Sequence, residues 1–327
     1  MNTFTYKKVY ITSSYTLLSS LAHKPIISSY VDKVVDDYYM KKKSVEEAES
    51  EYQNICIKEI LKKNKLKETD IDILISGDLQ NQISSSVYSA KNFDIPHIGV
   101  YSACASFAES MLIGASFIES NTIKKALIVS SSHNLVAEKQ FRFPIEYGSL
   151  KKKINSFTVS GSVSTLMSNT KSNIKLVSST IGKVVDIGYK DTNNFGALMA
   201  PSASKTLYEH LKNTKTKVDD YDLILTGDLG VYGILILKEY FYKLYNIELK
   251  NIIDCGAYIY NCVVGSSFSG GSGPICWPLV FFSKFSKSKK YNKILVIATG
   301  ALHSSSSANR KETLPSISHV LSLEVNK

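Results

Sequence analysis

"DILISGDL", residues 72–79, and "DLILTGDL", residues 222–229, set the architecture, because the second stretch repeats the first 150 residues further along the chain. Each stretch is an apolar strand that ends in Gly-Asp-Leu, and each follows a segment typical of a helix. A second pair of apolar strands, at 124–133 and 292–303, agrees in the same way, and both of its members end near a histidine. Two matched pairs predict an internal duplication.

The duplication predicts two halves, residues 1–172 and 173–327. Strands that are apolar on both faces are typical of parallel sheets covered by helices, so each half is expected to be rich in βαβ units. Such halves pack as layers of helix and sheet. Ligand sites in these sheets lie at the carboxyl ends of the strands. Four side chains near strand ends are therefore expected to line a central cleft: Asp78, His133, Asp228 and His303.

The composition is that of a globular chain of 327 residues with a strong basic bias. Hydrophobic residues make up 44% and charged residues 21%, and the net charge is +10. Lysine supplies 37 of the 39 basic residues, and the only arginines are Arg142 and Arg310. The lysine runs allow two interpretations, solvated faces or attraction to anionic lipid headgroups. Nucleic-acid binding is not expected, because no recognised reader motif accompanies the lysines.

Targeting, metal and cofactor signals are missing from the sequence. The N-terminus lacks the apolar core of a signal peptide, and no run reaches the roughly 18 apolar residues of a spanning helix. A soluble or peripherally membrane-associated protein is therefore expected. Five cysteines without a CxxC pair argue against a disulfide framework or a zinc site. No dinucleotide or P-loop spacing occurs, so we expect neither a metal nor a cofactor.

The segment "GVYSACASFAES", residues 99–110, places Cys104 where a strand gives way to a helix. The dipole at a helix N-terminus lowers the pKa of a thiol, and the free N–H groups there hold an oxyanion or a carboxylate. The alternative is a buried cysteine that only packs. A cysteine nucleophile also needs a base, and His133 and His303 are the candidates.

A second candidate segment, residues 133–148, mixes charged and aromatic side chains. It contains Arg142, whose planar guanidinium binds carboxylates with two hydrogen bonds. The functional interpretation is an anchor for an anionic ligand. The structural alternative is an ion pair with Glu138 or Glu146.

Duplicated halves with a cysteine opening the central helix of the first half resemble the thiolase superfamily. The chain is more specifically similar to the stage V sporulation protein AD family of spore-forming bacteria. Ten segments carry that resemblance in order between residues 77 and 319: "GDLQNQISSS", "IPHIGVYSACAS", "SSSHNLVAEKQFRFPIEYG", "FTVSGS", "NNFGALMAPSASKT", "YDLILTGDL", "DCGAYIYN", "GGSG", "ILVIATGAL" and "KETLPSISH".

The resemblance implies a thiolase-like α/β fold, a layered α/β/α/β/α sandwich. It also implies binding of dipicolinic acid, free or as its calcium chelate, for uptake into or release from spores. The partners it implies are membrane-embedded proteins of the SpoVA channel complex at the spore inner membrane. A homodimer is expected by analogy with other thiolase-like proteins.

The resemblance to thiolases breaks down at their catalytic residues. Aligning the thiolase GHPxGxSG loop on residues 266–273 puts Ser267 at the histidine position. The segment "VIATGALHS", residues 296–304, has no counterpart of the second thiolase cysteine, and Phe107 replaces a glycine after Cys104. We therefore expect a binding protein without enzymatic activity. The expected ligand contacts are Cys104, His133, Glu138 and Arg142.

An acyltransferase is the alternative interpretation. It would use Cys104 as nucleophile and either His133 or His303 as base.

Overall fold

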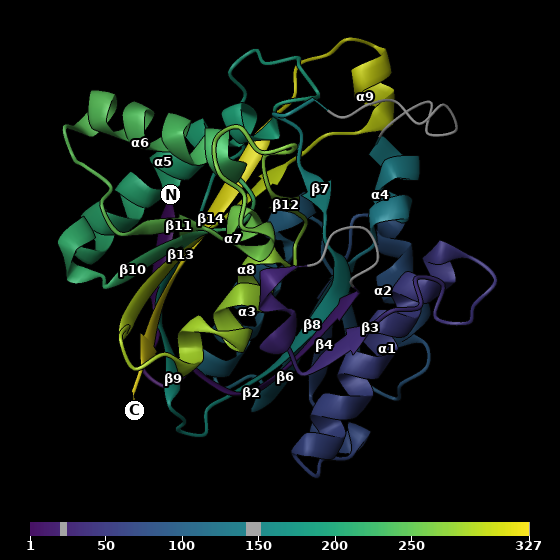
Figure 1. The fold of residues 1–327 in the computed structure, drawn as a ribbon. Coiled ribbons are helices and arrows are strands. Elements are labelled where there is room, and N and C mark those ends of the chain that lie inside the picture. Colours follow the sequence, from purple (N-terminus) through teal and green to yellow (C-terminus); the bar gives the residue numbers. More distant parts are fainter. Residues whose placement is uncertain (20–24, 142–151, 327) are drawn as a thin grey trace.

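The computed structural model describes residues 1–19, 25–141 and 152–326, and most of its strands form one mixed sheet that runs through both halves (Figure 1). Five strands belong to the first half; in sheet order they are β2 (Tyr10–Ser19), β8 (Ser160–Ser168), β6 (Lys125–Ser132), β4 (Ile73–Gly77) and β5 (His97–Gly99). The second half has the matching order β9 (Ile174–Ile181), β14 (Ser316–Val325), β13 (Lys293–Ala301), β10 (Leu223–Thr226) and β11 (Ile252–Asp254).

The two sets of five strands meet where β2 pairs antiparallel with β9. In each half the two edge pairs are parallel and the third pair, β6–β8 or β13–β14, is antiparallel. The sheet is therefore mixed, whereas the apolar strands predicted parallel pairing. Two further strands join this sheet: β1 (Asn2–Thr5) pairs with β9, and β3 (Lys33–Val35) pairs with β2. A separate two-stranded sheet is formed by β7 (Phe157–Thr158) and β12 (Gly271–Ser272). The first strand, β1, therefore pairs with a strand of the second half. The boundary between the two halves at residue 172 stays a prediction.

Helices form three layers around the strands, as the thiolase-like α/β/α/β/α sandwich predicts (Figure 1). The outer face of the first half carries α1 (Val45–Lys63) and α2 (Ser84–Ala90), and the outer face of the second half carries α5 (Phe195–Thr214) and α6 (Gly230–Tyr245). The middle layer contains α3 (Ser106–Glu119) and α8 (Cys276–Ser283). Three shorter helices lie near the strand ends: α4 (Asn134–Phe141), α7 (Cys255–Tyr260) and α9 (Ser305–Asn309).

The sequence sets the helix ends through capping side chains. Ser44 accepts a hydrogen bond from the N–H of Glu47 at the start of α1, and Asn194 accepts one from the N–H of Ala197 at the start of α5. These side chains satisfy N–H groups that have no partner within the helix. The capped start of α5 fixes the position of Phe195 beside the site described below.

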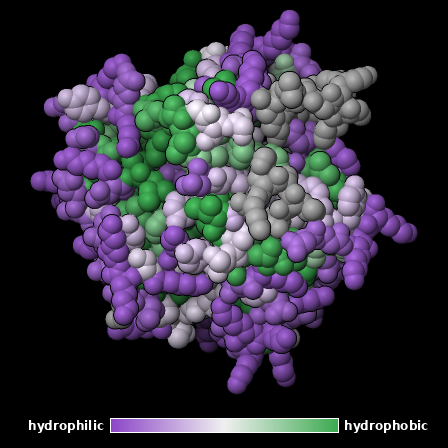
Figure 2. Space-filling view, viewed as in Figure 1, coloured by the Kyte–Doolittle hydropathy of each residue, from purple (hydrophilic) through white to green (hydrophobic). Residues whose placement is uncertain are grey.

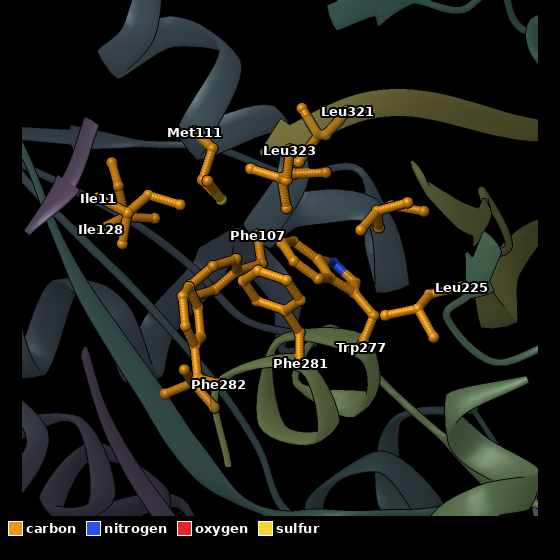
Figure 3. Packing of buried hydrophobic residues seen from close by; sticks show 14 of the residues in the cluster. Ile11, Phe107, Met111, Ile128, Leu225, Trp277, Phe281, Phe282, Leu321 and Leu323 are labelled. Carbon is orange, nitrogen blue, oxygen red and sulfur yellow. The ribbon is translucent and has the colours of Figure 1, made fainter. Parts of the chain in front are cut away.

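Aromatic side chains fill the middle layer (Figure 3). The ring of Phe107 on α3 meets the edge of Trp277 on α8 at 5.4 Å and 81°, and Phe282 at 6.4 Å. Phe107 is 0% exposed and Trp277 is 1% exposed. The side chain that replaces a thiolase glycine is therefore part of the core.

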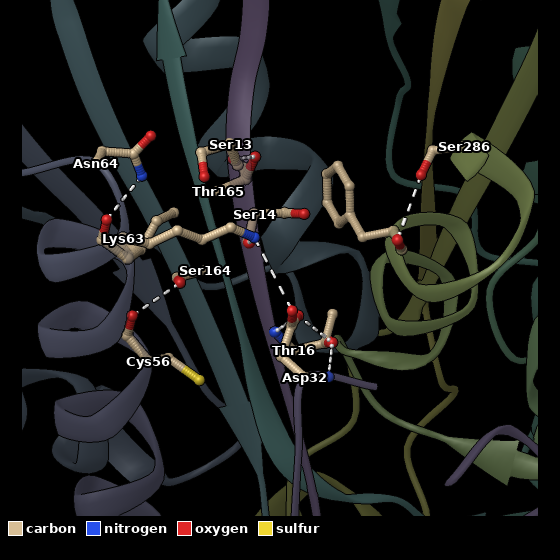
Figure 4. Close-up of polar contacts among 12 residues, drawn as sticks. Ser13, Ser14, Thr16, Asp32, Cys56, Lys63, Asn64, Ser164, Thr165 and Ser286 are labelled. Carbon is tan, nitrogen blue, oxygen red and sulfur yellow. Dashed lines mark hydrogen bonds and ion pairs between the residues drawn. The ribbon is translucent and has the colours of Figure 1, made fainter. Parts of the chain in front are cut away.

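Polar contacts tie the edge of the first half together (Figure 4). The Asp32 carboxylate accepts hydrogen bonds from the N–H and hydroxyl of Thr16 at 2.9 and 2.7 Å. The Ser164 hydroxyl donates to the carbonyl of Cys56 at 3.0 Å. These bonds hold β2 and β8 to the segments that cover them.

The surface is mostly hydrophilic around the rim of the face shown in Figure 2, while hydrophobic residues gather nearer its centre. Within the described ranges, the helices are all too short or too polar to cross a bilayer.

Candidate functional site

A cavity of about 660 Å³ lies where the strand ends of the second half meet the start of the central helix α3. Its floor is formed by Leu79, Ala103, Cys104, Asp228 and Ser272. Its walls come from α4, from the start of α5, from the loop that precedes α5, and from the segment that runs from the end of β13 into α9. Both halves of the chain therefore contribute to one cavity.

The turn before α3 holds Cys104 against the end of β13. Ala103, at the start of a 3₁₀ turn (Ala103–Ala105), has a φ of 49°, which a residue with a Cβ rarely adopts. The carbonyl oxygen of Ser102 packs so closely on Gly300 that a Cβ there would lie 2.2 Å from it. Strained backbone of this kind is typical of functional sites and persists because the surrounding structure fixes it.

The Cys104 thiol lies beside Ser272 and the buried carboxyl group of Asp228 rather than hydrogen-bonded to any histidine that the structure describes. Its Sγ is 3.8 Å from the Ser272 hydroxyl, which donates to Asp228 at 3.0 Å. Asp228 also accepts hydrogen bonds from the N–H of Gly273 at 3.2 Å and from the Thr299 hydroxyl at 3.1 Å. These bonds link the floor of the cavity to the end of β13.

The expectation that the helix N-terminus lowers the pKa of Cys104 is wrong. Burial raises the pKa of this thiol well above its usual range, and the negative charge of Asp228 raises it further. Burial also raises the pKa of the Asp228 carboxyl. Because thiolate is the reactive form of cysteine, the site favours an unreactive thiol.

His303 lines the cavity and lacks a partner. It is 4% exposed, and neither ring nitrogen has a hydrogen-bond partner among the described residues. Its ring is 5.4 Å from that of Phe141 and 5.6 Å from that of Phe195. Burial lowers the pKa of His303. The lowered pKa favours the neutral imidazole, whose two ring nitrogens are buried although the residue lines the cavity.

His133 occupies the equivalent position in the first half, but the structure does not bring it to the cavity lining. Its Nε2–H donates to the carbonyl of Tyr38 at 3.0 Å, and its Nδ1 accepts from the N–H of Leu135 at 3.2 Å. Burial lowers the pKa of His133 to about 4. With both nitrogens occupied by neighbours in the chain, the geometry supports neither the expected ligand contact nor a role as base for Cys104.

Asp78 also departs from the expectation that four strand-end side chains line one cleft. Its carboxylate accepts the N–H groups of Gln80 and Ser86, both at 2.7 Å, and so holds the start of α2. Glu49 is buried nearby, where it accepts hydrogen bonds from Gln80 and Ser131. Of the four side chains, Asp228 and His303 line the cavity, while Asp78 and His133 support the first half.

The segment after His133 is only partly described. Glu138 on α4 lines the cavity, as does Lys139, whose ammonium pairs with Glu46 at 3.0 Å. Arg142 and Glu146 lie outside the described residues, so the predicted anchoring role of Arg142 stays a prediction.

Sequence reasoning missed most of the cavity lining, including Ser272, Phe195 and Lys190. The glycine-rich stretch around Ser272 could have indicated this part of the site. Gly273 adopts a φ of 119°, which favours glycine, and its N–H donates to Asp228. Ser267, placed by alignment at the thiolase histidine position, is exposed and does not line the cavity. No metal-binding cluster of three or more His, Cys, Asp or Glu side chains exists within residues 1–19, 25–141 and 152–326.

Comparison with known families identifies the chain's relatives. The family model for stage V sporulation protein AD matches residues 2–324. Stage V sporulation protein AD from Bacillus subtilis is 37% identical over 315 residues, which cover 95% of this chain and 93% of the relative.

Solved structures of thiolase-like enzymes share the fold. 3-Oxoacyl-[acyl-carrier-protein] synthase III from Aquifex aeolicus has a TM-score of 0.58 and 14% identity, covering 97% of this chain and 99% of its own. A variant of OleA from Xanthomonas campestris has a TM-score of 0.60 and 16% identity, with coverage of 97% and 99%. At such identities the likeness establishes the thiolase-like fold and leaves the activity open.

Proposed function

The chain belongs to the stage V sporulation protein AD family, and from this premise we propose that it binds dipicolinic acid, free or as its calcium chelate, without acting as an enzyme. The ligand would occupy the cavity that Cys104 and His303 line. Binding there would serve uptake of dipicolinic acid into spores or its release during germination.

The observation that carries the proposal is the chemistry of the cavity wall. A volume of about 660 Å³ lies within the range of small-molecule sites, roughly 300–1,000 Å³. Phe141, Phe195 and His303 present three rings that suit a flat aromatic ligand. The exposed Lys190 adds a positive charge at the wall, and no carboxylate among the described residues pairs with it.

The Asp228 carboxyl group in the lining bears on the form of the ligand. An ionised Asp228 would repel a free dianion, whereas a one-to-one calcium chelate of dipicolinate carries no net charge. Arg142, predicted as the carboxylate anchor, would offset part of that repulsion. Cys104 would contribute surface and a weak hydrogen bond, since its raised pKa keeps it a thiol.

The wider assembly is part of the proposal. The partners would be membrane-embedded proteins of the spore dipicolinate channel, and the lysine-rich surface would favour peripheral association with anionic membrane. A homodimer is proposed by analogy with thiolase-like proteins.

Calorimetric titration with dipicolinic acid, with and without calcium, tests the ligand. Saturable binding is expected for the 2,6-dicarboxylate and not for phthalate isomers. Arg142→Ala is expected to weaken binding at least tenfold. The matched control is Arg310→Ala, because Arg310 is exposed, pairs with Glu312 at 2.8 Å, and lies outside the cavity lining. Folded wild-type protein that binds no dipicolinate in either condition would refute the proposal.

Acyl transfer is the second candidate function, because Cys104 and His303 line the same cavity in a fold shared with 3-oxoacyl synthases. The raised thiol pKa and the neighbouring Asp228 argue against it. Incubation with acyl-coenzyme A of several chain lengths, followed by intact-protein mass spectrometry, distinguishes the two. An acyl adduct that vanishes in Cys104→Ala would favour the enzyme; unmodified protein is the expected result.

A further inference from the structure

Within the described part of the chain, His303 differs from the other buried histidines in making no hydrogen bond. His133 uses both ring nitrogens within the chain, and His210 bonds Thr180 at 2.8 Å with one nitrogen and lies 3.5 Å from the Tyr221 hydroxyl with the other. His303 is as well buried as these, yet both of its nitrogens lack partners among the described residues. A buried polar group without a partner is unfavourable, so each one calls for an explanation.

The cavity supplies the explanation, because His303 forms part of its wall. The ring sits between Phe141 at the end of α4 and Phe195 at the start of α5. Neither phenyl ring offers a strong acceptor, and no described residue of the wall accepts a hydrogen bond from the imidazole. Both ring nitrogens are buried, so a ligand oxygen would provide the missing acceptor once a small shift of the wall brought it to one of them.

The charged and titratable groups around the cavity come from every element that surrounds His303. They are Glu138 and Lys139 on α4, Lys190 in the loop before α5, and Asp228 and Cys104 on the floor. The lining residues of α9, Ser305, Ala308 and Asn309, are uncharged. Lys139 is partly neutralised by Glu46. The described lining thus holds no excess positive charge that would keep His303 neutral once an anion enters.

We propose that His303 contacts the ligand and takes up one proton from solution when an anionic ligand fills the cavity, so that binding is proton-linked. This inference rests on the proposed function. In the empty cavity the ring is desolvated and stays neutral, in line with its lowered pKa. A carboxylate beside the ring favours the imidazolium, whose N–H groups then both donate.

Proton linkage has a measurable consequence for affinity. Over the pH range between the pKa of His303 in the empty cavity and its pKa in the complex, the Kd rises with pH by up to about tenfold per unit. Aromatic carboxylates are fully ionised above about pH 6, so ligand protonation does not contribute there. The pH dependence of the Kd above pH 6 therefore arises from protonation of the protein.

Calorimetry of the full chain with dipicolinic acid at pH 7, in two buffers of different ionisation enthalpy, measures the protons taken up on binding. We expect close to one proton for the wild type and close to none for His303→Gln. The Kd of the wild type should rise by up to tenfold from pH 7 to pH 8, and that of the variant should stay flat. His97→Gln is the matched control, because His97 is a half-buried histidine on β5 that does not line the cavity.

The outcomes separate this inference from the proposed function. Wild-type binding without proton uptake, or uptake that persists in His303→Gln, overturns the role of His303 and leaves dipicolinate binding intact. No binding by the wild type at any pH overturns both. If His303→Gln fails to bind, the protonation state of His303 can be measured directly, from its imidazole NMR resonance in isotope-labelled wild-type protein. A shift to the charged form on adding ligand at pH 7 supports the proposal, and an unchanged neutral resonance refutes it.

Discussion

Replacing Phe107 with alanine should destabilise the protein by about 4–5 kcal/mol. The side chain is 0% exposed and packs its ring against Trp277 and Phe282 in the middle layer (Figure 3). Truncating a buried phenylalanine to alanine costs about 3–5 kcal/mol through lost burial and the cavity left behind. Each edge-to-face pair adds about 0.5–1.5 kcal/mol beyond burial, so the expected cost lies at the upper end.

The single tryptophan of the chain makes the assay simple. Trp277 is 1% exposed, so its fluorescence should shift to the red when the middle layer opens in urea. The free energy of unfolding is read from the urea transition of each variant. Phe117→Ala is the control, because Phe117 lies on the same helix and is only partly buried. We expect its cost to stay below about 2 kcal/mol, since less area returns to water.

A loss of less than about 2 kcal/mol for Phe107→Ala, or equal losses for the two variants, would refute the reasoning. It would mean that α3 does not depend on the aromatic cluster. Cys104 immediately precedes α3, so the same variant also tests whether the middle layer holds the floor of the cavity in place.

Two further substitutions test the buried carboxyl group of Glu49 and the turn at Cys104. Burial and the nearby Asp78 raise the pKa of Glu49 well above its usual range, so the stability it contributes is present at low pH and is lost as the pH rises through its folded-state pKa. Glu49→Gln should remove this loss, which reaches about 1.4 kcal/mol per pH unit. The measurement is the free energy of unfolding from urea transitions at pH 5 to 9, and equal decreases in both proteins would contradict the prediction. Gly300→Ala would put a Cβ 2.2 Å from the Ser102 carbonyl oxygen and should weaken dipicolinate binding at least tenfold in calorimetry, whereas Gly227→Ala, with its nearest atoms 4.0 Å away, should not.

The duplicated strands made the layered fold predictable. The Gly-Asp-Leu repeat marks β4 and β10, which occupy the same place in the two halves, and the strands before His133 and His303 are β6 and β13. Apolar pattern alone could not give the antiparallel β6–β8 and β13–β14 pairs. A strand buried on both faces is apolar whichever way its neighbour runs.

The site was less predictable, because its chemistry depends on burial and on contacts far apart in the chain. The helix dipole at Cys104 was a sound local argument. The pKa of the thiol is nevertheless raised, by desolvation and by the charge of Asp228, 124 residues further on. Local sequence likewise could not tell that Ser272 would lie 3.8 Å from the thiol.

The matching strand ends carry the same residue types, Asp and His, but use them differently. Asp78 and His133 are saturated by hydrogen bonds from their own half, to Gln80 and Ser86 in one case and to Tyr38 and Leu135 in the other. Their second-half counterparts, Asp228 and His303, face the cavity because the turn at Cys104, from the first half, packs onto the end of β13 at Gly300. The first copy therefore lies within its own half, whereas the second copy lines the cavity, where Asp228 is held by Ser272, Gly273 and Thr299 and His303 has no hydrogen-bond partner among the described residues.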